Sequence, residues 1–193
     1  MVNFAGKPKQ FIAIDMGSKR LNKVIVICGG ICSGKTYIAN LISKRIEHPV
    51  ASFGKYLKNY CEKNNLPTDR KTLQDIGEKF VDTIPQKFLN DVIDHFIGDS
   101  DTIIIEGVRH ISIFELINSL TETKTSIFIE ADHQTRYDRY CIRINDSDDF
   151  KTFEEFLRLD EHPVEVETKF LKSLCNITID STKPLDENLF VSF

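Results

Sequence analysis

Eight consecutive residues have the types and spacing of a phosphate-binding loop (P-loop). In order they are Gly29, Gly30, Ile31, Cys32, Ser33, Gly34, Lys35 and Thr36. Glycines let the backbone curl so that several N–H groups point at one anion, and a following helix adds positive partial charge there. Lys35 would reach the β- and γ-phosphates of a nucleoside triphosphate, and the Thr36 hydroxyl would hold Mg²⁺. The motif therefore predicts a nucleoside triphosphate site.

The segments on both sides of this loop have the patterns that the motif requires. Residues 24–28 are continuously apolar, as in a strand buried on both faces, and residues 36–46 have the spacing of a helix. Strand, glycine-rich loop and helix in this order form the arrangement in which the motif holds phosphate. The alternative is a chance glycine turn before a helix, and the intact context makes it the weaker interpretation.

A carboxylate and an arginine follow the apolar segment at residues 102–105. Glu106 would lie at a strand end from which an acidic side chain organises Mg²⁺ and its waters beside a P-loop. Gly107 leaves room for substrate, and the planar guanidinium group of Arg109 could pair with a phosphate. The alternative is a surface acid and arginine in a turn, and the P-loop elsewhere in the chain favours the functional interpretation.

Three arginines lie on one face of a predicted helix. Arg136, Arg139 and Arg143 are spaced i, i+3 and i+7. Asp132 can cap the start of this helix. The three charges repel unless anions lie between them, and a triphosphate undergoing transfer is such an anion. We therefore predict that these arginines are catalytic, with a solvated face paired to local acidic residues as the alternative.

The segment after these arginines has the features of a lid. The polar run at residues 145–149 predicts a tip that closes over substrate. A capping box at residues 152–155 starts the next helix. Asp160 and Glu161 follow this helix and could contact the lid arginines, but we favour a helix end in solvent.

Side chains at and beyond residues 50–53 are candidates for binding the phosphate acceptor. Phe53 lies at the end of this segment, Arg70 could bind a phosphate of the acceptor, and Gln74 could hydrogen-bond a base or another polar group. Gly77 inside a helix costs about 1 kcal/mol relative to alanine, which indicates close packing or ligand approach. An ordinary amphipathic helix with an exposed arginine explains Arg70 and Gln74 equally well.

Apolar segments that alternate with helical patterns must position all of these residues. Candidate strands are residues 24–28, 50–53, 102–106, 126–130 and 176–180. Candidate helices lie at residues 36–46, 56–61, 73–81, 85–97, 136–143 and 152–159. The alternation predicts an α/β fold with a three-layer, doubly wound parallel sheet. Ligands of such sheets bind at the carboxyl ends of the strands.

Length, charge and cysteine content limit the classes of function. The 193 residues fit one domain with a sizeable core. The net charge of −4 argues against nucleic acid as a partner, and no apolar run is long enough for a membrane span. Five cysteines without a CxxC pair favour a reducing cytoplasm. We expect a cytoplasmic monomer or homodimer whose partner is a small-molecule phosphate acceptor.

From residue 23 to residue 186 the chain resembles the nucleoside and nucleotide monophosphate kinases of the P-loop kinase group. It is similar in particular to the nucleotide-kinase-like and dephospho-CoA-kinase-like proteins. The resemblance rests on residues 29–36, 52–54, 70–77, 105–109, 136–139 and 152–161. It implies a P-loop kinase fold with strand order 2-3-1-4-5, ATP with Mg²⁺ as the phosphoryl donor, and a helical lid.

Two departures from the related pattern bear on the acceptor. The pattern usually has Asp where this chain has Glu106, so the contact to Mg²⁺ would run through water. Dephospho-CoA kinases carry a catalytic Asp just after the second strand, where this chain has Ser52, Phe53 and Gly54. The resemblance therefore implies transfer of the ATP γ-phosphoryl group to a phosphorylated acceptor, and a (deoxy)nucleoside monophosphate fits better than dephospho-CoA.

Two other classes of function are alternatives. A nucleotide-dependent ATPase or regulatory switch is disfavoured because no guanine-reading Asn-Lys-x-Asp motif follows the P-loop. The third apolar segment also ends in Glu106-Gly107 rather than in the Asp-Glu pair that activates water. A module that binds nucleotide without catalysis is disfavoured by the intact Lys35, Thr36 and Glu106. We divide the chain into an N-terminal extension at residues 1–22 and a P-loop kinase domain at residues 23–193, with the lid around residues 133–162.

Overall fold

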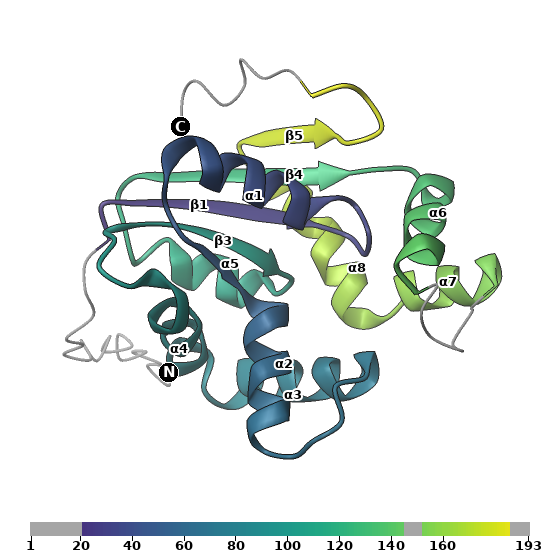
Figure 1. The fold of residues 1–193 in the computed structure, drawn as a ribbon, viewed down its shortest axis with the longest axis horizontal. Helices are drawn as coiled ribbons and strands as arrows, with labels where there is room; N and C mark the ends of the chain where they lie inside the picture. The colour runs from purple at the N-terminus through teal and green to yellow at the C-terminus, as the bar shows by residue number, and fades with distance from the viewer. Residues whose placement is uncertain (1–20, 145–151, 186–193) are drawn as a thin grey trace, which may run out of the picture.

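The computed structural model describes residues 21–144 and 152–185 and shows one parallel sheet (Figure 1). Its strands are β1 (Lys23–Gly29), β2 (Val50–Ser52), β3 (Thr102–Val108), β4 (Lys124–Glu130) and β5 (Ile177–Asp180). Every neighbouring pair is parallel, and the strand order is β2-β3-β1-β4-β5. The predicted doubly wound sheet and its order are confirmed.

Helices connect these strands, and several of them lie between β4 and β5 in the sequence. They are α1 (Lys35–Ile46), α2 (Phe53–Lys63), α3 (Arg70–Thr83), α4 (Pro85–Ile97), α5 (Ile111–Ile117), α6 (His133–Ile144), α7 (Phe153–Asp160) and α8 (Pro163–Phe170), followed by the 3₁₀ helix η1 (Leu171–Leu174). Sequence reasoning missed α5 and α8. Helices of seven and eight residues repeat the apolar spacing too few times to be recognised by it alone, and these two lack the capping box that marked α7.

Two hydrophobic clusters form the three layers. On one face of the sheet, α1 packs against alternate strand residues such as Ile25 and Ile27. On the other face, α4, α5 and η1 cover the intervening residues, such as Val24 and Val26. Side chains of a strand point alternately to opposite faces, so a continuously apolar strand fills both clusters. Figure 1 shows α1 in front of the strands, with α4 and α5 on the opposite side.

Two strand ends differ in detail from the prediction. Phe53 begins α2 rather than ending β2, because the Ser52 hydroxyl accepts the N–H of Lys55 at 3.3 Å and caps the helix. Strand β3 continues through Gly107, where the register with β1 shifts. Gly107 has a backbone φ of 85°, which residues with a side chain rarely adopt, so the backbone conformation favours glycine at this position.

The strands point toward the edge from which the P-loop and α6 emerge. In Figure 1 the arrowheads face α6, α7 and α8, and the α2–α3 pair lies below them. Leu21, which the sequence placed in the extension, is buried, and its N–H donates to Leu120 O at 3.3 Å. Residues 1–20 of the N-terminal extension and the lid tip at residues 145–149 lie outside the described residues.

Candidate functional site

The P-loop lies between β1 and α1, as predicted, and its backbone is built on glycine. Gly29 has φ of 145° and Gly34 has φ of 98°. A Cβ atom on Gly29 would lie 2.3 Å from the backbone oxygen of Ile129. Any other residue would therefore force β1 and β4 apart and distort the start of the loop. This geometry fits the curled backbone that turns N–H groups toward a phosphate.

Lys35 folds back on the loop that it ends. Its Nζ donates to Gly30 O at 2.5 Å, and the side chain is buried. Burial and, second, the positive charge of Arg109 lower the pKa of Lys35 to about 8, and the carboxylate of Glu106 opposes this only in part. The structure therefore brings Lys35, Glu106 and Arg109 within electrostatic reach of one another.

Glu106 is held by the neighbouring strand. Ser52 lies opposite Glu106 in the β2–β3 register, and its hydroxyl donates to Glu106 Oε1 at 2.5 Å. The same Ser52 oxygen caps α2, so one side chain joins the start of this helix to the acidic residue. This arrangement fixes the Glu106 carboxylate at the carboxyl end of β3, beside the P-loop.

Arg70 and Arg109 meet at Glu165, which sequence reasoning missed. Glu165 lies in the first turn of α8, and its side chain is 1% exposed. Its Oε1 accepts a hydrogen bond from Arg70 Nη2 at 2.8 Å and another from Arg109 Nη1. Burial and, second, the charge of Arg70 lower the pKa of Arg109 to about 10, so Arg109 stays cationic at neutral pH. One carboxylate thus serves two arginines.

The other predicted acceptor residues lie on α2 and α3. Gln74 follows Arg70 by one helical turn, and its Nε2 is buried. The ring of Phe53 is buried and makes an edge contact with Phe88 at 5.2 Å, so any contribution to acceptor binding stays a prediction. A Cβ atom on Gly77 would lie 3.3 Å from Leu57 Cδ1, so close packing of α3 on α2 explains this glycine.

Arg136 is buried and paired, rather than free for a triphosphate. Its Nη1 and Nη2 donate to the two carboxylate oxygens of Asp160 at 2.6 and 2.8 Å. Nη1 also lies 3.4 Å from Ile31 O, and a Cβ atom on Gly30 would approach it to 3.0 Å. The solvent-exposed helix end that we favoured for Asp160 is therefore wrong. Asp160 joins α7 to the P-loop through Arg136, whereas Glu161 is exposed.

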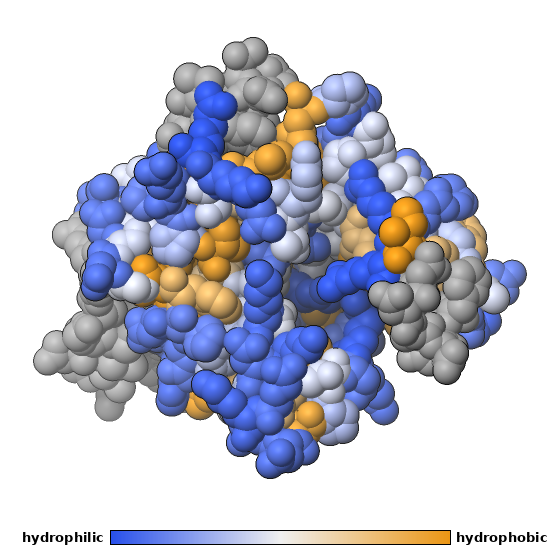
Figure 2. All heavy atoms as spheres, in the orientation of Figure 1, coloured by the Kyte–Doolittle hydropathy of each residue, from blue (hydrophilic) through white to orange (hydrophobic). Residues whose placement is uncertain are grey.

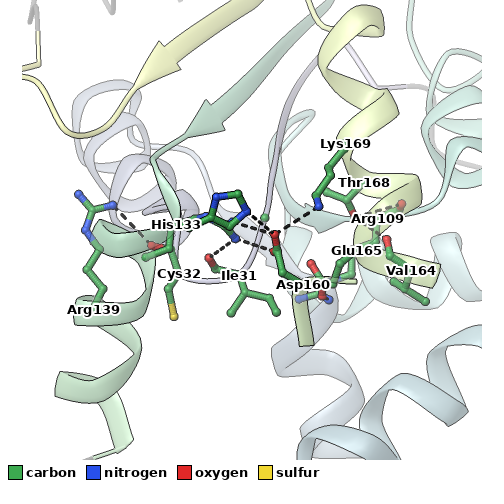
Figure 3. A network of polar contacts seen from close by, with 12 residues as sticks. Ile31, Cys32, Arg109, His133, Arg139, Asp160, Val164, Glu165, Thr168 and Lys169 are labelled. Atoms are coloured by element: carbon green, nitrogen blue, oxygen red, sulfur yellow. Dashed lines mark hydrogen bonds and ion pairs between the residues drawn. The ribbon is translucent and has the colours of Figure 1, made fainter. Parts of the chain in front are cut away.

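Figure 3 shows how Asp160 joins three helices. His133 of α6 and Lys169 of α8 each approach its Oδ2 to 3.3 Å. Burial alone would raise the pKa of Asp160, but hydrogen bonds and charge from Arg136, with a smaller contribution from Lys169, lower it to about 2. The carboxylate is therefore ionised throughout the neutral range and fixes α6 against α7 and α8.

The other two arginines of α6 have different surroundings. Arg139 donates to Ser181 Oγ at 2.9 Å, to Ser181 O at 2.8 Å and to Ser33 O at 3.3 Å. It therefore ties the P-loop to the segment after β5. Arg143 is exposed, and its charge adds to the effect of burial in lowering the pKa of Arg70. The arginine face thus divides into two residues that contact the P-loop and one that faces solvent.

A recessed part of the surface lies near the helices that carry Arg70 and Arg136. Figure 2 shows this recess in the region between the α2–α3 pair and the α6–α7 pair, with mostly hydrophilic residues around it.

Thr36 is exposed at the start of α1. Within residues 21–144 and 152–185, no three His, Cys, Asp or Glu residues gather closely enough to hold a metal ion by themselves. Within the same ranges no helix is long and apolar enough to cross a membrane.

Comparisons with known proteins agree with this architecture. The sequence pattern of a protein family described as an AAA domain matches residues 25–159. A UPF0200 protein of Pyrobaculum aerophilum is 26% identical over 165 residues, which cover 85% of this chain and 91% of that protein.

The fold is that of P-loop kinases. Shikimate kinase from Acinetobacter baumannii in complex with shikimate has a TM-score of 0.56 at 12% identity, covering 90% of this chain and 91% of that one. Shikimate kinase from Aquifex aeolicus has a TM-score of 0.51 at 17% identity, covering 83% and 87%. A gluconokinase from Sinorhizobium meliloti has a TM-score of 0.51 at 13% identity, covering 86% of each chain.

Proposed function

Because the chain belongs to the AAA domain family and has a P-loop kinase fold, we propose that it transfers the γ-phosphoryl group of ATP to a phosphorylated small molecule. One observation carries this proposal. Three cations lie in series, each within electrostatic reach of the next: the charge of Arg109 lowers the pKa of Lys35, and the charge of Arg70 lowers the pKa of Arg109. Glu106 and Glu165 balance two of these three charges, so the site keeps one net positive charge, which favours the binding of phosphate groups.

The donor half of the site would be the P-loop. Lys35 would exchange its bond to Gly30 O for the β- and γ-phosphates. Thr36 directly and Glu106 through water would hold Mg²⁺, which neutralises charge on these phosphates. The exposed Thr36 hydroxyl and the fixed Glu106 carboxylate are oxygen ligands of the kind that Mg²⁺ takes. Arg139 and Arg136 would keep the loop in place, and Arg143 would add charge from the lid.

The acceptor half would be the α2–α3 side of the recess. Arg109, which follows β3, and Arg70 would provide guanidinium groups for a phosphate, and Gln74 would provide a side-chain amide for hydrogen bonding. A (deoxy)nucleoside monophosphate has a phosphate that could pair with the two arginines and a base that could hydrogen-bond to the Gln74 amide. Most of the rate enhancement would come from positioning and from charge stabilisation, as in other phosphoryl transfer reactions.

A panel assay tests this proposal. We expect ADP release from ATP and Mg²⁺ to rise at least tenfold over the acceptor-free rate with one or more (deoxy)nucleoside monophosphates. Dephospho-CoA, shikimate and gluconate complete the panel. Steady hydrolysis that no acceptor stimulates would indicate an ATPase instead, and tight ATP binding without turnover would indicate a binding module.

The lowered pKa of Lys35 predicts proton uptake when ATP binds. Near pH 8 about half of the free protein carries a neutral Lys35, and a bound triphosphate restores the charge by raising the pKa. Calorimetry at pH 8 in two buffers of different ionisation enthalpy should give an uptake of about half a proton per ATP. At pH 6 this contribution should vanish, because Lys35 is already protonated. Equal uptake at both pH values would contradict the assignment.

A further inference from the structure

Three of the unpaired buried polar atoms lie on residues of the proposed acceptor site. Among residues 21–144 and 152–185, the buried side-chain atoms without a hydrogen-bond partner are Ser33 Oγ, Arg70 Nε, Gln74 Nε2 and Glu165 Oε2. A buried polar atom that bonds to nothing costs about 1–3 kcal/mol, and more when the group is charged. A group of such atoms at one place therefore indicates a ligand that completes them.

The contacts of Glu165 differ from those of Asp160, which also pairs with an arginine. Asp160 accepts hydrogen bonds from the guanidinium group of Arg136 on both of its carboxylate oxygens, at 2.6 and 2.8 Å. Glu165 receives Arg70 and Arg109 on Oε1 alone, while Oε2 stays buried and unbonded. If Glu165 served only to neutralise the two arginines, using both oxygens would be more favourable. Its second oxygen is thus an acceptor available beside two cations.

The neighbouring unpaired atoms are both donors. Arg70 Nε and Gln74 Nε2 belong to residues one turn apart on α3, so they lie on the same face of the helix. Together with Glu165 Oε2 they form a set of two donors and one acceptor. A complementary ligand carries oxygen atoms that accept from Arg70 and Gln74 and also a group that donates to Glu165. A phosphate alone at neutral pH lacks a second, independent donor group.

We propose that Glu165 determines acceptor specificity, with Oε2 accepting a hydrogen bond from a hydroxyl or N–H group of a phosphorylated acceptor. The phosphate of the same molecule meets Arg70 and Arg109. The inference rests on the proposed function and names the acceptor class more closely: a phosphate ester that also carries a hydrogen-bond donor. Nucleoside monophosphates meet this requirement through a sugar hydroxyl or a base N–H. Compounds that lack such a donor leave the buried Oε2 unpaired and are rejected.

Glu165→Gln tests the inference, because glutamine keeps an oxygen for the two arginines and replaces the second oxygen with an amide that donates. With the preferred acceptor we expect kcat/KM to fall about 10- to 100-fold, the cost of one mispaired buried group. The KM for ATP should change less than twofold. Methyl phosphate has the phosphate but no separate donor, so it should inhibit the variant at least as well as the native protein.

Glu167→Gln is the matched control. Glu167 lies on the same helix and contacts the Ile111 N–H at 2.7 Å and His110 Nδ1 at 3.0 Å rather than either arginine, so removing its charge should leave acceptor selection unchanged. A parallel loss of acceptor use and methyl phosphate inhibition in Glu165→Gln would overturn the inference, since Glu165 would then only position the arginines. Unchanged acceptor kinetics would overturn it as well.

The failure of the proposed function is a separate outcome. If the native protein transfers phosphate to no compound of the panel, the kinase proposal fails, and calorimetric binding of the nucleoside monophosphates then tests the role of Glu165. Binding that weakens at least tenfold in Glu165→Gln, while methyl phosphate binding is retained, supports the inference. Binding of no compound, or equal binding to both proteins, overturns it.

Discussion

Lys35→Ala should lower acceptor-stimulated ADP release at least about 1000-fold, because the variant loses the cation that meets the β- and γ-phosphates. Three other cations already have partners: Arg109 is engaged with Glu165, and Arg136 and Arg139 hold the P-loop backbone. Initial rates with saturating ATP and the best acceptor give the measurement. Activity within tenfold of the native rate would contradict a transfer site at this loop.

The stability of Lys35 variants separates loss of chemistry from loss of fold. The folded protein disfavours the charged lysine, since burial and Arg109 lower its pKa to about 8. Lys35→Met keeps the aliphatic chain without the charge, so at pH 7 it should be at least as stable to urea as the native protein while equally inactive. Lys44→Ala, an exposed lysine change on the same helix, should leave rate and stability nearly unchanged.

Asp160→Ala should destabilise the protein by about 3–5 kcal/mol, the usual cost of leaving a buried charge without its partner. Arg136 is 6% exposed and has both of its terminal nitrogens on Asp160. Arg136 also contacts Ile31 O in the P-loop, so displacing its side chain should change the position of this loop. The affinity for ATP should therefore fall together with the stability. Urea denaturation and nucleotide titration measure the two effects.

Two comparisons make this prediction specific. Asp138→Ala removes an exposed carboxylate of α6, the helix that carries Arg136, and should cost less than about 0.5 kcal/mol. A double variant, Arg136→Met with Asp160→Leu, should regain most of the lost stability, since no unpaired charge is left. A loss below 1 kcal/mol in Asp160→Ala, or no recovery in the double variant, would contradict a structural ion pair.

The same pair predicts an acid limb of stability. The folded-state pKa of Asp160 is about 2, below the ordinary value near 3.9 in an unfolded chain. The stabilisation is therefore complete above about pH 4 and is lost as the pH falls through about 2. Asp160→Ala should lack this part of the pH dependence.

Local patterns were enough to predict most of the elements. The strands lie within two residues of the predicted bounds because short, continuously apolar runs are typical of strands in a sheet covered on both faces. The P-loop motif predicted its own strand and helix, and the cap at Asp132 is observed as a bond from the Thr135 N–H at 2.8 Å. The short helices α5 and α8 were missed, and α8 carries Glu165. The one local signal for α8 was Pro163, followed two residues later by an acid, a pairing typical of a helix start.

The sequence by itself determined the P-loop, the parallel sheet and the cations around the strand ends, because these depend on local spacing and on the alternation of strands and helices. Only the tertiary structure decided which charges meet. Arg136 and Asp160 lie 24 residues apart, and Arg109 and Glu165 lie 56 apart. No local pattern fixes such pairs, because folding brings their helices together through packing of the whole core. The tertiary structure therefore decided that Arg136 supports the loop and that Glu165 joins the acceptor site.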